Sequence, residues 1–96
     1  MTKDTLYRLL KQNYVKMDKF GIKRIGFFGS VARNEATTGS DVDMLVEFSG
    51  PATFDRYMDL KMFLEQMLGA HVDLVTQKAL KPRLREVIEK ETIYVT

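Results

Sequence analysis

Four short apolar runs, each of four to eight residues, alternate with longer amphipathic segments along this sequence. Runs of this length that are rich in β-branched and aromatic residues are typical of strands, because such side chains pack well on a pleated surface. We therefore expect strands at residues 22–28, 41–48, 71–75 and 92–95, the last of them at an edge of a sheet. This alternation points to an α/β architecture.

The segments between these runs repeat their apolar residues at spacings of three and four, which is the period of a helix. We expect helices at residues 2–20, 53–68 and 82–90, and a short helical turn at 31–34. Thr2 and Thr53 suit N-cap positions, and Gly69 suits a C-cap. Because the short connections permit antiparallel pairs, the predicted fold is an α/β sandwich with helices packed on a small mixed sheet, in one domain over residues 1–96.

Composition narrows the class of protein. The chain has no cysteine, which excludes disulfides and cysteine–zinc sites and fits a cytoplasmic location. His71 is the only histidine, so we expect a surface residue rather than a zinc ligand. No apolar run approaches the roughly 18–20 residues that cross a bilayer, and no signal peptide is evident, so we expect a soluble, unexported protein. A net charge of +2 does not by itself indicate nucleic-acid binding.

Two aspartates interrupt the second apolar run. Asp41 and Asp43 are two residues apart on a predicted strand, so their side chains point to one face, with Cα atoms roughly 6.5–7 Å apart. A divalent cation would remove the repulsion between them, and Mg²⁺ prefers such carboxylates together with substrate phosphates. The alternative is that both acids lie at a solvent-facing strand end.

Asp73 repeats this anomaly in the third apolar run, His71-Val72-Asp73-Leu74-Val75. If the second and third strands are neighbours, Asp73 joins the other two acids. Three carboxylates suit two metal ions that clamp a phosphoryl displacement, and Asp73 is also placed to take a proton from an attacking hydroxyl. The alternative is an exposed acid at a strand edge.

Gly29 and Ser30 follow the first predicted strand and precede the short helical turn. Glycine allows a ligand to approach the backbone closely, and amides at the start of a helix suit a phosphate. The Ser30 hydroxyl can add a hydrogen bond to the terminal phosphates. On its own a Gly-Ser pair is an ordinary turn, and it gains weight from the Asp-x-Asp pair about ten residues later.

Together these residues resemble the minimal nucleotidyltransferase (MNT) family of the DNA polymerase β superfamily. The family pattern has Gly-Ser, an Arg in the short helix, Ser-Asp-x-Asp before an apolar strand, and a third acid in a Val-Asp-Leu-Val strand. The matching segments here are 29–35, 40–48 and 72–75, and the resemblance extends over nearly the whole chain. It implies the minimal nucleotidyltransferase fold. Many relatives carry Arg where this chain has Val31, a departure that weakens one expected phosphate contact and leaves the acids intact.

The resemblance also implies roles for single residues. Gly29 and Ser30 would contact the nucleotide phosphates, Arg33 would lie near the phosphates or the partner, and Ser40 would belong to the nucleotide-binding set. The catalytic and metal-binding residues, which would hold two Mg²⁺ ions, would be Asp41, Asp43 and Asp73.

By resemblance, the chain is expected to be the antitoxin of a toxin–antitoxin pair. It would transfer AMP from ATP to a tyrosine hydroxyl of a HEPN-domain ribonuclease toxin. One alternative is a non-catalytic nucleotide-binding antitoxin that neutralises its partner by forming a complex. Another is a small nucleic-acid-binding domain, although the chain lacks an aromatic platform or a recognition motif for one.

Overall fold

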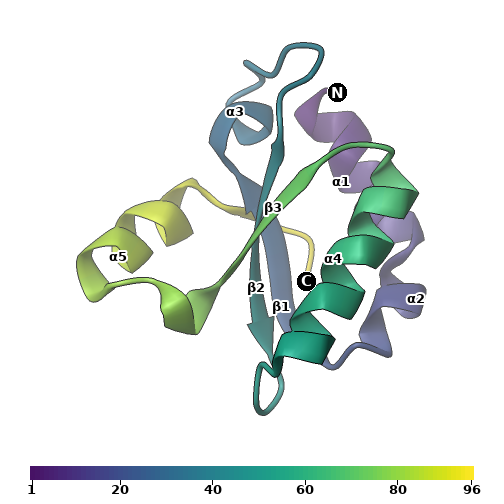
Figure 1. Cartoon of the computed structure of the whole chain (residues 1–96). Coiled ribbons are helices and arrows are strands. Elements are labelled where there is room, and N and C mark those ends of the chain that lie inside the picture. Colours follow the sequence, from purple (N-terminus) through teal and green to yellow (C-terminus); the bar gives the residue numbers. More distant parts are fainter.

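The centre of the fold is an antiparallel pair of strands, β1 (Ile22–Phe28) and β2 (Val42–Phe48), in a computed structural model of residues 1–96 (Figure 1). β3 (Val72–Thr76) pairs with β2 in parallel, and β4 (Ile93–Tyr94) pairs with β1 antiparallel. The strand order is therefore β3-β2-β1-β4, with β4 at one edge. This confirms the predicted α/β fold with a small mixed sheet.

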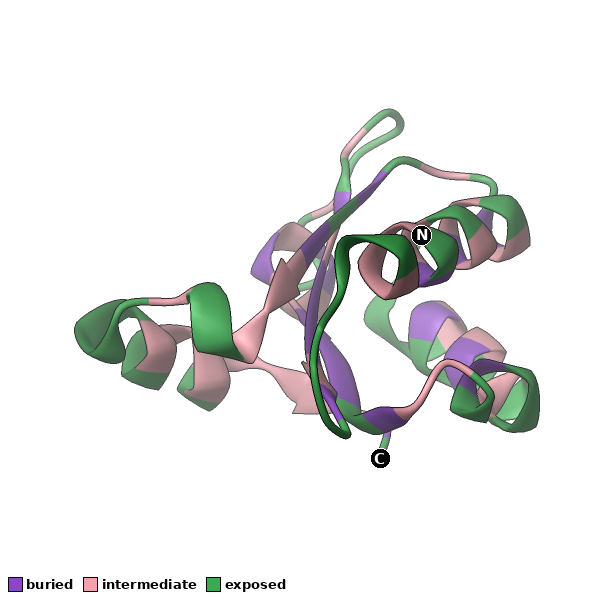
Figure 2. Ribbon diagram, turned by 60° about the horizontal axis from the view of Figure 1, so that its bottom comes forward, coloured by how far each residue is buried: buried purple, intermediate pink, exposed green.

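Three helices cover one face of this sheet: α1 (Lys3–Gln12), α2 (Tyr14–Asp18) and α4 (Phe54–Leu68). The buried core lies between them and the sheet, as the purple segments of Figure 2 show. Its members include Leu6, Leu10, Met17, Ile25, Phe27, Met44, Val46, Leu60, Leu64, Leu68, Val72 and Leu74. None of the helices combines the length and apolar character needed to cross a membrane.

The opposite face of the sheet is covered only in part, by the segment at Gln77 and by α5 (Pro82–Glu91), which stands to one side in Figure 1 and has no buried residue. The alternation along β2 explains the difference between the faces. Its even-numbered residues belong to the core, whereas Asp43, Leu45 and Glu47 point the other way, because side chains alternate along a strand. We call this second surface the open face.

The structure corrects the first predicted helix, residues 2–20, which is broken at Asn13 into α1 and α2. The Asn13 side chain donates to the Leu9 carbonyl over 2.8 Å, and its backbone leaves helical geometry with ψ near 9°. Asparagine competes in this way for backbone groups, and the apolar period continues across the break, so periodicity alone conceals it.

The other elements agree with the prediction to within two residues, and several caps are confirmed. Thr2 accepts a hydrogen bond from the Thr5 amide, Thr53 accepts one from the Arg56 amide, and Gly69 closes α4 with φ of 64°. The short turn predicted at 31–34 forms α3 (Gly29–Ala32), so Gly29 is already in the helix. A 3₁₀ turn, η1 (Gln77–Ala79), was not predicted.

Because the core lies on one face only, we predict that Leu64→Ala destabilises the fold far more than Met62→Ala on the same helix. Leu64 is fully buried and Met62 is 62% exposed. The first change leaves a cavity and should cost about 2–5 kcal/mol, while the second should stay within about 0.5 kcal/mol. Urea unfolding followed by circular dichroism measures both, and equal losses would contradict this account of the core.

Candidate active site

Asp43 and Asp73 are brought together by the sheet register. They are partner residues on the parallel strands β2 and β3, and both alternate away from the core, onto the open face. Neighbouring strands lie about 4.7–4.9 Å apart, so the two carboxylates are immediate neighbours. We expected Asp73 to join the other acids if the second and third strands are neighbours, and the structure shows that they are.

α4 holds β3 in this position from its outer side. The Val72 amide donates to Glu65 Oε2 over 3.0 Å, and the Tyr57 hydroxyl donates to the Leu74 carbonyl over 2.5 Å. These bonds flank Asp73 and occupy backbone groups that an edge strand would otherwise leave unpaired. The edge next to the acids is therefore fixed by side chains of this chain.

Asp41 lies one residue before β2 and is exposed. Its Oδ1 atom is 3.3 Å from Nδ1 of His71, the residue directly before β3. The Val42 amide donates to the His71 carbonyl over 2.9 Å, which fixes the backbones of both segments. His71 is a surface residue, as expected, and its ring holds the Asp41 side chain beside the start of β3.

Gly29 directly follows β1 and lies beside Asp43. Its φ of 73° lies in the left-handed region, and a Cβ at this position would lie 2.2 Å from Asp43 Oδ2. The closeness follows from the register, because Phe28 is the partner of Asp43 across β1 and β2. Only glycine meets both requirements, so the structure places the Gly-Ser turn directly beside Asp43.

Ser30 is the second residue of α3 and is half-buried beside this turn. Val31, the position at which the family resemblance raised the expectation of an arginine, is 1% exposed and belongs to the core. Its side chain therefore does not face the acids. Ser40 closes the preceding loop: its Oγ accepts a 3.0 Å bond from the Thr37 amide and lies 3.1 Å from Thr37 Oγ1.

Arg33 follows α3 and is held by two carboxylates. Its Nε donates to Glu35 Oε2 over 3.1 Å, and its Nη1 donates to Glu91 Oε1. The hydrogen bond to Glu35, and after it the bond to Glu91, raises the pKa of Arg33 above its ordinary value. The same Glu91 oxygen accepts a 3.1 Å bond from the Gly29 amide.

Glu91 was not predicted as a site residue. It lies in the last turn of α5, where the helix dipole favours a basic residue rather than an acid. That local conflict is the signal in the sequence that marks the residue. Nothing local identifies its partners, which lie about sixty residues earlier, at Gly29 and Arg33.

Negative charge accumulates around Asp43. Burial raises the pKa of the Asp43 carboxyl, and the charges of Asp73 and Asp41 raise it further, while Arg33 opposes the shift. A cation bound here would relieve this repulsion, and carboxylate oxygens are the ligands that Mg²⁺ prefers. The donor set therefore fits Mg²⁺ in chemistry, although no three acidic or histidine side chains converge in a ready-made metal-binding group.

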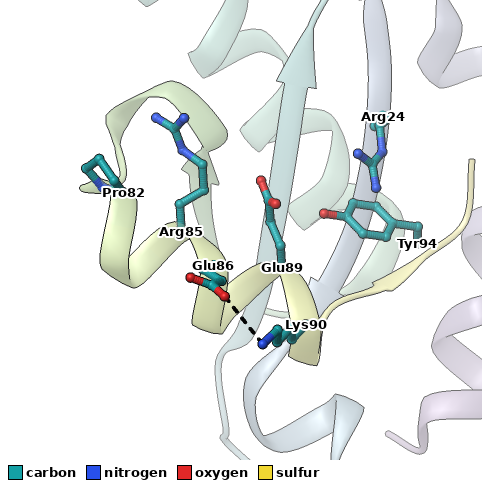
Figure 3. A pocket seen from close by; sticks show the side chains of 7 residues that line it. All are labelled: Arg24, Pro82, Arg85, Glu86, Glu89, Lys90 and Tyr94. Carbon is teal, nitrogen blue, oxygen red and sulfur yellow. Dashed lines mark ion pairs between the residues drawn. The ribbon is translucent and has the colours of Figure 1, made fainter.

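The hollows of the surface lie away from the acids. The largest, of about 530 Å³, lies between α5 and β1 (Figure 3). Its lining residues are Arg24, Pro82, Arg85, Glu86, Glu89, Lys90 and Tyr94. None of the hollows is lined by Asp41, Asp43 or Asp73. The acids thus lie on an open surface rather than in a pocket for a small acceptor.

Known proteins are similar to this chain in sequence. A nucleotidyltransferase domain model matches residues 8–95. The protein adenylyltransferase MntA of Thermococcus cleftensis is 40% identical over 78 residues, covering 81% of this chain and 79% of MntA. A Methanocaldococcus jannaschii protein, provisionally named a protein adenylyltransferase, is 41% identical over 90 residues, covering 91% of this chain and 90% of that protein.

Solved structures agree. One that is provisionally described as a minimal nucleotidyltransferase matches with a TM-score of 0.83 at 40% identity, covering 97% of this chain and 95% of that one. A chain from the complex of a tri-AMPylated Shewanella oneidensis HEPN toxin with an MNT antitoxin matches with a TM-score of 0.69 at 18% identity, covering 94% and 71%. At that identity the second match shows a shared fold alone.

These matches extend over nearly the whole chain, which therefore belongs to the nucleotidyltransferase domain family in its minimal form. Enzymes of this family transfer a nucleotide, so a nucleotide is the substrate that the site must accept. More particularly, the chain is a protein adenylyltransferase, like its relatives at about 40% identity.

We predict that Gly29→Ala weakens both the fold and ATP binding, because the new methyl group meets Asp43 Oδ2. Gly39→Ala is a matched control: Gly39 has φ of 90° but no atom within 4 Å of its added Cβ. Both changes strain the backbone, and only the first also displaces a carboxylate, so it should cost about 1–3 kcal/mol more. Thermal unfolding and ATP titration measure the two effects, and equal behaviour of the variants would contradict the contact.

Proposed function

We propose that this chain transfers AMP from ATP to a tyrosine hydroxyl of a HEPN-domain ribonuclease toxin, and so acts as its antitoxin. The observation that carries the proposal is the pairing of Asp43 with Asp73 on an open face beside the Gly29-Ser30 turn. The relative MntA is named a protein adenylyltransferase. A solved chain with the same fold comes from a complex between an AMPylated HEPN toxin and an MNT antitoxin.

The openness of the site favours a protein as the acceptor. No hollow lined by the three acids is available to enclose a small acceptor. A folded partner would bring its hydroxyl to the open face and cover the reacting groups with its own surface. Exclusion of water by the partner would also protect ATP from hydrolysis at this exposed place.

In the proposed reaction the tyrosine oxygen attacks the α-phosphorus of ATP and forms a new P–O bond. The bond from the α-phosphorus to the bridging oxygen of the β-phosphate breaks, and pyrophosphate leaves. Asp73 accepts the proton of the hydroxyl, which is the role of a general base. Asp41 is the third acid of the site, next to Asp43.

Around the triphosphate, Ser30 would donate its amide and hydroxyl, Arg33 would supply positive charge, and Gly29 and Ser40 would shape the adjoining turns. The residues that would hold Mg²⁺ are Asp41, Asp43 and Asp73, whose oxygens suit this ion. When bound, Mg²⁺ would offset the negative charge that accumulates on the phosphates and carboxylates.

We predict that Asp73→Asn lowers AMP transfer by about 10²–10⁴-fold, because the general base is lost. Asp59→Asn, an exposed aspartate on α4 away from the acids, is the matched control and should retain full transfer. Each variant is co-expressed with a HEPN-domain toxin, and the intact mass of the toxin is measured for gains of AMP. Equal gains in all samples would remove Asp73 from the reaction.

The same experiment separates catalysis from simple complex formation. If Asp73→Asn abolishes the mass gain and the toxin regains ribonuclease activity, transfer is what neutralises it. If the toxin stays inactive without gaining mass, the chain acts by binding its partner, and the catalytic proposal is wrong for neutralisation.

A further inference from the structure

Glu91 joins the end of α5 to both ends of the segment from Gly29 to Arg33, which we call the phosphate turn. One carboxylate oxygen accepts from the Gly29 amide, the first residue of α3, and from Arg33 Nη1, the residue after its last turn. Arg33 is held from its other side by Glu35. α3 is only four residues long, so the two bonds of Glu91, to Gly29 and to Arg33, span the whole helix.

The bond from the Gly29 amide to Glu91 limits the hydrogen-bond donors that remain for a triphosphate. Since the Gly29 amide is engaged by Glu91, the next hydrogen-bond donors along α3 are the amide and hydroxyl of Ser30. The bond to Glu91 also fixes the orientation of the peptide between Phe28 and Gly29, where the chain turns with φ of 73°. The orientation of Ser30 thus depends on a residue at the other end of the sequence.

Core packing does not account for this contact. α5 buries no residue, and the hollow of about 530 Å³ separates much of it from β1 (Figure 3). Its other glutamates are engaged elsewhere: Glu86 pairs with Lys90 over 3.4 Å, and Glu89 accepts a bond from Gln77 over 2.7 Å. Among the three, Glu91 is the glutamate that hydrogen-bonds to the phosphate turn.

A carboxylate near the phosphates has an electrostatic cost unless it is neutralised. Arg33 provides the neutralising charge, and the two residues act on Asp43 in opposite directions: Arg33 lowers the pKa of Asp43 and Glu91 raises it. A bond between charged partners restricts the guanidinium more strongly than one between neutral groups. Glu91 therefore limits the positions that Arg33 can take beside the acids.

We propose that Glu91 is a positioning residue for adenylyl transfer, which holds the turn from Gly29 to Arg33 so that Ser30 and Arg33 face the triphosphate. The proposal rests on the proposed nucleotide site at Ser30 and Asp43. It assigns the carboxyl end of α5 a role in ATP binding, through Arg33 and the Gly29 amide rather than by contact with the substrate.

The test compares Glu91→Ala, Glu91→Gln and the control Glu86→Ala on the same helix. Loss of a charge-assisted bond should raise the Kd of Mg-ATP, and its KM in transfer, by about tenfold in Glu91→Ala. Glu91→Gln keeps an acceptor for the Gly29 amide and should recover part of this loss. Glu86→Ala should bind ATP as the wild type does. Calorimetry on the chain without acceptor measures Kd, and thermal unfolding reports the fold.

A double variant shows whether Glu91 acts through Arg33. If it does, Glu91→Ala combined with Arg33→Ala raises the Kd by less than the product of the two single increases, because both remove one interaction. Fully independent effects would overturn the proposal. So would a change in melting temperature with ATP binding intact, or tighter ATP binding in Glu91→Ala, which would make Glu91 a competitor of the phosphates.

The readouts also separate this proposal from the proposed function. If the wild type binds ATP but modifies no HEPN toxin, the acceptor is wrong and the Kd comparison still decides the role of Glu91. If the wild type transfers AMP and Glu91→Ala matches it in Kd and KM, only the role of Glu91 is wrong. If the wild type does not bind ATP, both proposals fail.

Discussion

The contact between Gly29 and Asp43 determines the geometry of everything around the site. The antiparallel register places Phe28 opposite Asp43, so β1 must end against the carboxylate, and a Cβ on the next residue would lie 2.2 Å from it. A slip of one residue in this pairing would turn Asp43 toward the core and move the turn away from it. The pairing of β1 with β2 therefore places the Gly29-Ser30 turn beside the strand that carries Asp43.

The one-sided core makes such an acidic strand tolerable. Three helices bury one face of the sheet, and the alternation along β2 and β3 sends Asp43 and Asp73 to the face that no helix layer covers. A second layer of helices would have to desolvate both carboxylates, at a cost that only a bound cation or a basic partner offsets. The exposure of this face is thus a condition of the chemistry proposed for it.

Local pattern predicted much of this, since the strands, α4 and the caps depend on neighbouring residues. Local pattern failed at Asn13, where the side chain bonds to the Leu9 carbonyl and the helix is broken while the apolar period continues. The adjacency of Asp43 and Asp73 could be stated only as a condition, because no local signal tells which strands pair across the α4 crossover. An acid in the last turn of α5 marks Glu91 as unusual, but its partners cannot be read from local pattern because they are distant in sequence.

The same dependence on distant residues gives α5 its significance. A helix with no buried residue gains little stability from apolar packing, so its place is set by polar contacts such as Glu91 with Gly29 and Arg33. Any force that moves the end of α5 is then transmitted to the turn next to Asp43, since one carboxylate oxygen links the two. The last helix and the turn after the first strand are thereby joined through one carboxylate oxygen, although they lie about sixty residues apart in the sequence.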